Sequence, residues 1–294
     1  MLLQQFIREG AGLLGALYPA REARALVERL VQDVQGLGPY AYIVDPSLEA
    51  SDAVREGLSR LLAGEPLQYI TGWQEFYGRR FKVNPGVLIP RPETEILVRE
   101  AVVRALELET PRVLDLCTGS GCIAWSIALE VQGARVTAVD LSDEALSVAR
   151  VQNPGLLHPE RERESISGAN QGFSAPRFVK ADVLKQGEYP GGPFDILTAN
   201  PPYIMESEKA RMHPNVLEHE PAMALFVPDE DSLVFCRAIA GCAAVNLRPG
   251  GWGIVEINES LGPQTARVFE SAGLQGVKII KDYSSRDRFV SFQT

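Results

Sequence analysis

The sequence has little of what membrane insertion or broad nucleic-acid binding requires. Its 294 residues include 29 Lys and Arg against 38 Asp and Glu, which gives a formal net charge of −9. Phosphate neutralisation needs clustered basic residues, so we expect no direct nucleic-acid binding. No apolar run approaches the ~18 residues of a membrane span, and we expect no membrane contact. The N-terminus reaches Arg8 and Glu9 too early for a signal peptide.

Cysteine and histidine are also scarce. The sequence has four cysteines, Cys117, Cys122, Cys236 and Cys242, and three histidines. The cysteines form no C-x-x-C pair and have no nearby histidine at zinc spacing, so we expect no metal site. Reduced, buried thiols are typical of a reducing compartment, so we expect a cytoplasmic protein. We also expect a monomer.

Residues 1–74 are expected to form a small helical domain. Apolar residues between Ala23 and Val34 recur at the spacing of one helix face. A later helix is expected to have Ser47 as its N-cap and to stop at Gly64. The region holds no catalytic constellation, so it either binds a partner or supports the next domain.

Residues 75–90 change character and predict a β-hairpin linker. Aromatic and apolar residues there surround turn residues at Gly78 and at positions 84–86. The linker leads into the segment PRPETE at 90–95, whose prolines forbid a helix until about Glu93.

Residues 91–294 alternate between short apolar strands and helices, which predicts an α/β domain with a mostly parallel sheet covered on both faces. The predicted strands are RVLDLC, RVTAVD, FVKAD, FDILTAN, GWGIVEI, GVKIIKDY and RFVSF. Only a few residues around Ser284 join the last two, so this pair should be an antiparallel hairpin. The polar stretch at 153–176 is expected to be a surface loop. The predicted fold is a seven-stranded, Rossmann-like domain with a small N-terminal helical domain.

A glycine-rich segment, DLCTGSG from Asp115 to Gly121, follows the first of these strands and opens a helix. Its glycines allow the backbone to approach a ligand without Cβ clashes. Asp140 ends the next strand, nineteen residues after Gly121, where a carboxylate can accept hydrogen bonds from both ribose hydroxyls. The segment 119–124 also satisfies G-x-G-x-x-A, so this loop alone supports NAD nearly as well as S-adenosylmethionine.

Asp182 and Val183 follow the third strand at the carboxyl edge of the sheet, where open α/β sheets bind ligands. Asp182 could accept a hydrogen bond from an adenine amino group, and Val183 could pack on the ring. An ordinary capping aspartate explains Asp182 equally well from its position alone.

The tetrapeptide Asn200-Pro201-Pro202-Tyr203 directly follows the fourth strand. Two prolines fix φ and remove two N–H donors, so the carbonyls of this stiff loop can face a pocket. With the Asn200 oxygen and the flat face of Tyr203, they suit an NH₂ group attached to a carbonyl or to an aromatic ring. A nitrogen held in this way can be aimed at a sulfonium methyl, and this displacement needs positioning and no metal. An amide and an adenine both remain open.

These motifs, in this order, resemble the protein-(glutamine-N5) methyltransferases that modify peptide chain release factors. The resemblance covers nearly the whole chain and is most specific in GEPLQYITGWQEFYGRRFKVNPGVLIPRPETEILV at 64–98. It continues through VLDLCTGSGCIA, FDILTANPPYI, EHEPAMAL and KDYSSRDRFV. It implies that the α/β domain is an S-adenosylmethionine-dependent methyltransferase. It also implies that the helical domain docks a release factor, whose Gly-Gly-Gln glutamine enters the catalytic domain.

The resemblance also implies roles for individual residues. Asn200 and Tyr203 become the catalytic residues that hold the glutamine amide, and the whole segment Asn200, Pro201, Pro202 and Tyr203 binds the substrate. The implied cofactor site consists of Cys117, Thr118, Gly119, Ser120, Gly121, Asp140, Val183 and Asn200, to which the position of Asp182 at the sheet edge adds that residue.

The chain departs from the family pattern at four places. Cys117 and Asn258 stand where the family usually has glycine. The segment 226–228 is Phe-Val-Pro where the family commonly has Asp-Gly-Gly, and the stretch at 153–176 is longer than expected. These departures concern the rim of the cofactor site and leave the reaction class unchanged.

The main alternative is a nucleic-acid adenine-N6 methyltransferase, because the same loop suits an adenine amino group. Such an enzyme pulls its base from a stack and usually shows a basic face or a recognition domain. A dinucleotide-dependent oxidoreductase would leave the tetrapeptide at 200–203 unexplained. A binding module without catalysis would have little use for both loops.

Overall fold

The computed structural model describes residues 1–152, 174–185, 187–188 and 190–294. The loop expected at 153–176 therefore lies almost entirely outside the described residues. The chain forms two compact units, one of residues 1–73 with 212–219 and the other of residues 74–211 with 220–294. Each unit is described by itself below. In the described part of the chain, no helix combines the length and the apolar character that crossing a membrane demands.

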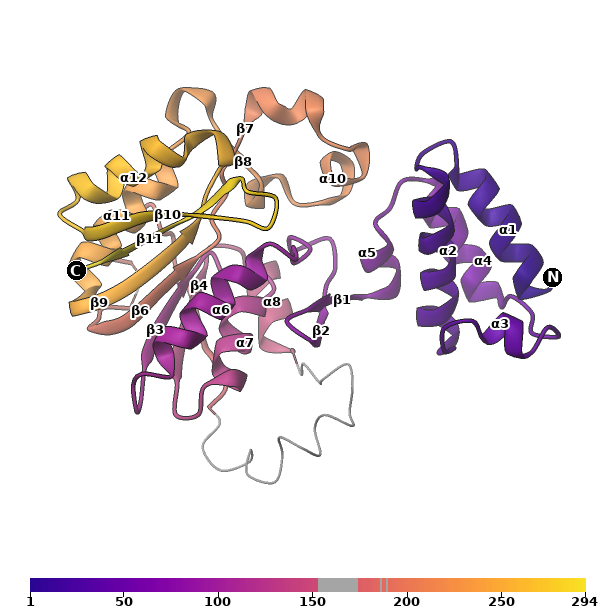
Figure 1. The fold of residues 1–294 in the computed structure, drawn as a ribbon, viewed down its shortest axis with the longest axis horizontal. Helices are drawn as coiled ribbons and strands as arrows, with labels where there is room; N and C mark the ends of the chain where they lie inside the picture. The colour runs from indigo at the N-terminus through magenta and orange to yellow at the C-terminus, as the bar shows by residue number, and fades with distance from the viewer. Residues whose placement is uncertain (153–173, 186, 189) are drawn as a thin grey trace. The chain divides into compact units, whose positions relative to one another are not determined.

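The helical unit, whose helices are labelled in Figure 1, has its own apolar core. Its helices are α1 (Leu3–Leu14), α2 (Ala20–Gln35), α3 (Ala41–Val44), α4 (Asp52–Leu62), α5 (Leu67–Thr71) and α10 (Pro214–His219). The prediction of Ser47 as an N-cap was wrong, because α4 begins at Asp52 and the Ser51 hydroxyl accepts the Val54 N–H at 3.3 Å. Ser47 instead donates to Asp45 in the preceding turn.

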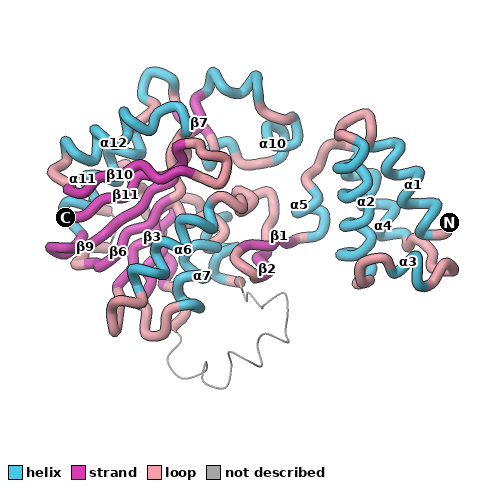
Figure 2. Tube along the Cα trace, in the orientation of Figure 1, coloured by secondary structure: helices cyan, strands magenta, loops and turns pink. Residues whose placement is uncertain are grey.

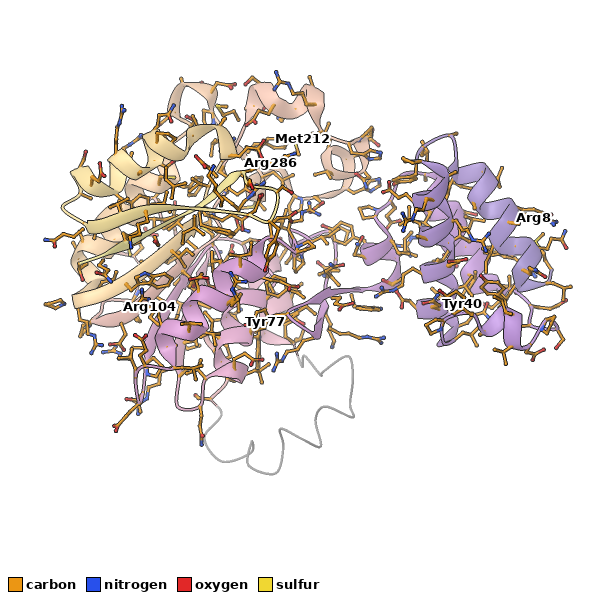
Figure 3. The ribbon with its side chains drawn as sticks, in the orientation of Figure 1. Arg8, Tyr40, Tyr77, Arg104, Met212 and Arg286 are labelled. Carbon is orange, nitrogen blue, oxygen red and sulfur yellow. The ribbon has the colours of Figure 1, made fainter. Side chains whose placement is uncertain are left out.

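The second unit begins with a two-stranded sheet of β1 (Trp73–Phe76) and β2 (Arg79–Lys82). Tyr77, labelled in Figure 3, lies in the turn between them and has a positive φ of 50°. Its N–H donates to the Glu95 carboxylate at 2.9 Å. This bond ties the turn to the segment PRPETE at 90–95.

The elements that follow alternate in type along the chain (Figure 2). The helices are α6 (Thr94–Ala105), α7 (Cys122–Glu130), α8 (Asp143–Arg150), α11 (Val234–Asn246) and α12 (Gly262–Ser271), with 3₁₀ turns η1 (Glu206–Arg211), η2 (Ala222–Ala224), η3 (Asp229–Asp231) and η4 (Glu259–Leu261). The strands are β3 (Arg112–Leu116), β4 (Arg135–Asp140), β5 (Arg177–Lys180), β6 (Phe194–Ala199), β7 (Ile204–Met205), β8 (Phe226–Val227), β9 (Leu247–Glu256), β10 (Gln275–Lys281) and β11 (Asp287–Gln293).

The main sheet has seven strands in the order β10-β11-β9-β6-β3-β4-β5, which confirms the predicted fold class. Among the described strands of this sheet, β11 runs opposite to the others, and its antiparallel pairing with β10 confirms the expected terminal hairpin. Helices α6 and α7 bury one face of the sheet and α11 and α12 the other. The chain starts at β3, moves outward to β4 and β5, and returns through β6, so the strand order reverses between β3 and β6. In open α/β sheets, ligands bind outside the strand ends at such a point.

Candidate active site

The glycine-rich loop after β3 has an unusual backbone. Gly119 and Gly121 have φ values of 54° and 80°, and Cys117 has a φ of 57°. Glycine adopts this left-handed region freely, whereas a residue with a Cβ is strained there. The usual family glycine at 117 would suit this backbone, so the cysteine in this chain stands at a position of local strain.

Asp115, near the end of β3, holds the glycine-rich loop in place through Thr118. Its fully buried carboxylate accepts hydrogen bonds from the Thr118 hydroxyl at 2.6 Å and from the Thr198 hydroxyl at 2.8 Å. Burial raises the pKa of Asp115 to about 7, although both hydroxyls favour the ionised form. Because Asp115 lies opposite Thr198 in the β3–β6 pairing, one carboxyl holds the loops that follow both strands.

Asp140 lies at the end of β4, as its position in the sequence predicts. Its Oδ2 accepts the Gly119 N–H at 2.8 Å and its Oδ1 accepts the Ser142 N–H at 2.9 Å. Burial raises the pKa of this carboxyl, and the backbone hydrogen bonds oppose that shift. Asp182 lies two residues beyond the paired end of the neighbouring strand β5, where its Oδ1 accepts the Leu184 N–H at 2.9 Å.

A pocket with about 1090 Å³ of empty volume, part of it open to solvent, lies over these strand ends. The predicted site residues that line it are Cys117, Thr118, Gly119, Ser120, Asp140, Asp182, Val183, Asn200 and Pro202. Gly121, Pro201 and Tyr203 are absent from the lining: Gly121 is the N-cap of α7, and the hydroxyl of Tyr203 is bound to Glu256. The structure therefore brings the glycine loop, the β4 carboxylate and Asn200 around one space.

Two other segments complete the pocket wall. Val87, Leu88, Pro90, Arg91 and Thr94 come from the linker and the PRPETE segment, and Pro221, Met223 and Ala224 come from the EHEPAMAL segment. The buried Glu220 carboxylate joins the two, because it accepts the Ile89 N–H at 3.1 Å and pairs with Arg91 at 2.5 Å. The sequence predicts no role for Thr94 or Glu220, although both lie in segments that carry the family likeness.

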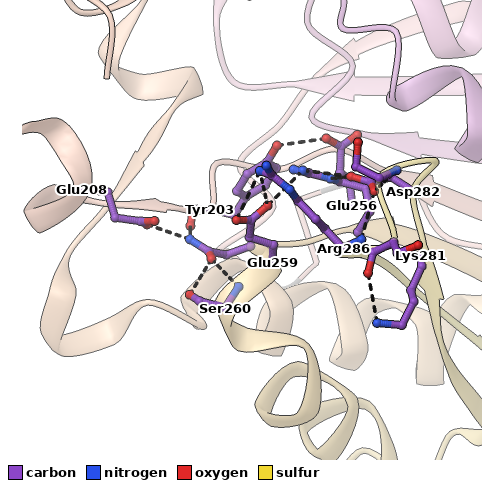
Figure 4. Close-up of polar contacts among 12 residues, drawn as sticks. Tyr203, Glu208, Glu256, Glu259, Ser260, Lys281, Asp282 and Arg286 are labelled. Carbon is purple, nitrogen blue, oxygen red and sulfur yellow. Dashed lines mark hydrogen bonds and ion pairs between the residues drawn. The ribbon is translucent and has the colours of Figure 1, made fainter. Parts of the chain in front are cut away.

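Asn200 and Tyr203 are joined through two further side chains. The Asn200 amide Nδ2 donates to the Thr94 hydroxyl at 3.3 Å. Thr94 in turn donates to Glu256 Oε2 at 2.7 Å, and the Tyr203 hydroxyl donates to Glu256 Oε1 at 2.9 Å (Figure 4). Glu256 ends β9 and is 1% exposed. Burial raises the pKa values of both Glu256 and Tyr203.

The departures from the family pattern also lie beside this loop. The Asn258 side chain donates to the Tyr203 carbonyl at 3.1 Å and to Glu208 at 2.7 Å (Figure 4). A glycine at this position could make neither bond. Residues 226–227 form β8, which pairs with β7 directly after the tetrapeptide. The Asn258 side chain therefore adds support to the loop at 200–203.

The arrangement is that of a largely apolar pocket with few polar groups, which is typical of a small-molecule site. Its lining includes the Asp140 carboxylate and the Asn200 amide. Such a site can hold a nucleoside-like ligand beside a planar group that bears N–H bonds.

Comparison with known proteins identifies the family. No family model matches the chain. The release factor glutamine methyltransferase of Bacteroides thetaiotaomicron is 39% identical over 279 residues, which cover 94% of each chain. That of Flavobacterium psychrophilum is 32% identical over 297 residues, covering 99% of this chain and 98% of the relative.

A solved structure gives a further comparison. It is a release factor-specific protein-(glutamine-N5) methyltransferase from Alicyclobacillus acidocaldarius, 28% identical in sequence, with a TM-score of 0.40. The match covers 72% of this chain and 98% of that one. Sequence identity over nearly the full length of the curated relatives decides the assignment: the chain belongs to the release factor glutamine methyltransferase family.

Proposed function

We propose that this chain transfers a methyl group from S-adenosylmethionine to the side-chain amide nitrogen of the Gly-Gly-Gln glutamine in peptide chain release factors. One observation carries the proposal. Asn200, an amide that can hold another amide, lines the same pocket as the glycine loop and Asp140. The site expected for the methyl donor and the site expected for the acceptor nitrogen are thus contiguous.

The residues of the pocket fit the cofactor. The Asp140 carboxylate lies where it can accept hydrogen bonds from ribose hydroxyls, and the glycine loop provides close backbone approach. Val183 offers an apolar surface to the adenine ring, and Asp182 offers an acceptor to its amino group. When bound, S-adenosylmethionine supplies an electrophilic methyl group on a sulfonium.

The tetrapeptide at 200–203 positions the acceptor. Asn200 Oδ1 and a backbone carbonyl of the proline pair accept hydrogen bonds from the two N–H groups of the glutamine amide, while the ring of Tyr203 supports its plane. The amide nitrogen forms a bond to the methyl carbon as the bond from that carbon to sulfur breaks. The nitrogen then loses one proton to solvent. Positioning and charge stabilisation supply most of the catalysis in such a step.

The helical unit is proposed to dock the release factor. Exposed apolar residues gather at its α3 helix, where Tyr40, Ile43 and Val44 are all solvent-exposed. Adjacent exposed apolar side chains are typical of interaction surfaces. The protein is proposed to work as a cytoplasmic monomer without direct contact to nucleic acid or membrane.

The test is transfer of a labelled methyl group to a purified release factor and to the same factor with its Gly-Gly-Gln glutamine replaced by alanine. We expect label on the first protein only. Equal labelling of both factors would overturn the assignment. The adenine-N6 alternative is not favoured by the family, and labelling of DNA or RNA in a parallel reaction would revive it.

A further inference from the structure

Thr94 lines the pocket and Glu256 does not, and the proposed function assigns neither of them a role. They are 162 residues apart in the chain, and both are buried. Together they form one hydrogen-bonded chain that runs from Asn200 through Thr94 and Glu256 to Tyr203. The two residues proposed to hold the substrate amide are thus both connected by hydrogen bonds to the carboxylate of Glu256.

The charge on the Glu256 carboxylate determines which group donates in each hydrogen bond between Asn200 and Tyr203. An ionised carboxylate only accepts hydrogen bonds, so both hydroxyls must donate to Glu256. Thr94 has one hydroxyl proton, and its oxygen can then only accept from Asn200. The Asn200 amide must therefore turn its NH₂ toward Thr94 and leave its Oδ1 for the pocket.

The opposite charge state removes this constraint. A protonated Glu256 could donate to Thr94, whose proton would then be free to reach Asn200. The amide could then present its NH₂ to the pocket, where it would meet the NH₂ of the substrate as donor against donor. Buried donors left without an acceptor in this way are unfavourable, so the substrate amide would be held poorly.

We propose that Thr94 and Glu256 are positioning residues. Ionised Glu256, acting through Thr94, turns the Oδ1 atom of the Asn200 amide toward the substrate and its NH₂ group away. The same carboxylate holds the Tyr203 hydroxyl. The inference rests on the proposed function, because it assigns the means by which the same amide clamp is oriented. Several charged or titratable groups act on Glu256: Arg288 from β11, Glu93 at the start of α6, Tyr203 from the loop and Cys122 from α7.

The first experiment compares Thr94→Val with Thr94→Ser at saturating S-adenosylmethionine. Valine removes the hydroxyl at nearly constant volume, and serine keeps it. We expect Thr94→Val to lower kcat for the release factor at least tenfold with the Kd for S-adenosylmethionine within about threefold, because one charged hydrogen bond is lost. Thr94→Ser should restore most of that loss.

Thr265→Val is the matched control, because Thr265 is a buried hydroxyl residue in α12 outside the pocket lining. It should leave kcat unchanged. A Thr94→Val enzyme that shows only a lower Tm, with wild-type kcat below that Tm, would assign a merely structural role and overturn the inference. Equal kcat values for the valine and serine variants would also overturn it.

The second experiment measures kcat/KM of wild type and Glu256→Gln across pH. Glutamine mimics the protonated carboxyl, so the ratio of wild type to variant should approach one at low pH and rise at least tenfold as Glu256 ionises. Other titrating groups affect both enzymes and cancel in the ratio. A ratio that stays constant with pH overturns the inference and leaves the proposed function intact, whereas a wild-type enzyme that labels no release factor glutamine defeats both.

Discussion

The backbone N–H of Gly119 donates a 2.8 Å hydrogen bond to Oδ2 of Asp140, which joins the glycine loop to the end of the neighbouring strand. The Ser142 N–H holds the other oxygen at 2.9 Å. Asp140 is therefore fixed in orientation by two backbone donors, and its remaining lone pairs are available to a ligand in the pocket.

Asp140→Asn should weaken S-adenosylmethionine binding by about 10–100-fold, because a charge-assisted hydrogen bond contributes roughly 1.5–3 kcal/mol. Isothermal titration calorimetry measures the Kd. Asp143→Asn is the control, since this exposed carboxylate pairs with Lys180 on the surface and does not line the pocket. A Kd for Asp140→Asn within twofold of wild type would remove Asp140 from the cofactor site.

Asn200→Ala should lower kcat for the release factor by about 100-fold or more, because misplacement of the reacting group by about 1 Å has effects of this size. Cofactor affinity should change by less than about threefold, since Asn200 is one of many residues around the pocket. Single-turnover kinetics and calorimetry measure the two quantities. An equal loss in both would mean that Asn200 serves the cofactor instead of the acceptor nitrogen.

Cys117→Gly should leave the free energy of unfolding equal to wild type or raise it by up to about 1 kcal/mol, because glycine relieves the left-handed strain at φ 57°. Cys117→Val should lower it by about 1–3 kcal/mol, since a branched Cβ is worst in this region. Urea denaturation of the two variants measures the difference. Valine as stable as glycine would show that the backbone at 117 is not left-handed in solution.

Asp115 predicts a pH dependence of stability. Its folded-state pKa of about 7 lies above the ordinary 3.8, so its contribution is fully present below about pH 4 and is lost as pH rises through 7. The stability of wild type relative to Asp115→Asn should therefore fall by roughly 2–4 kcal/mol across this window. Denaturation at pH 4, 5.5 and 7.5 tests it, and a constant difference between the two proteins would contradict the raised pKa.

Docking by the helical unit predicts a change in KM alone. Ile43→Asp with Val44→Asp should raise KM for the release factor about tenfold or more, because charge would replace apolar contact area at α3. The value of kcat and the Kd for S-adenosylmethionine should stay within twofold. Val245→Asp is the control, being a similarly exposed apolar residue on α11. An unchanged KM in the α3 variant would defeat docking through this helix.

Much of the fold follows from local sequence signals. The strand that contains Asp115 and the strand before Asn200 are short apolar runs, which the sequence identifies as strands of a mostly parallel sheet. The terminal hairpin follows from the brevity of its turn. These features depend on neighbours in sequence, so periodicity and spacing are sufficient to find them.

The features that the sequence did not predict depend on contacts between residues far apart in the chain, or on choices between residues that are equally suitable by type. The bond from Thr94 to Glu256 spans 162 residues, and no spacing rule relates the two positions. The same is true of Glu220, which is 131 residues from Ile89. Ser47 and Ser51 are equally good caps by residue type, and only the path of the chain selects Ser51. The grouping of residues 212–219 with the helical unit has no sequence signature either.

The shared carboxyl of Asp115 bears on motion within the catalytic unit. Because it holds Thr118 beneath the glycine loop and Thr198 beneath the tetrapeptide, a displacement of either strand end is transmitted to the other. We therefore expect the two loops to move together, so that the gap between them varies less than the position of either one. Methyl transfer requires a constant distance between donor and acceptor, and this coupling maintains the distance without requiring the whole sheet to be rigid.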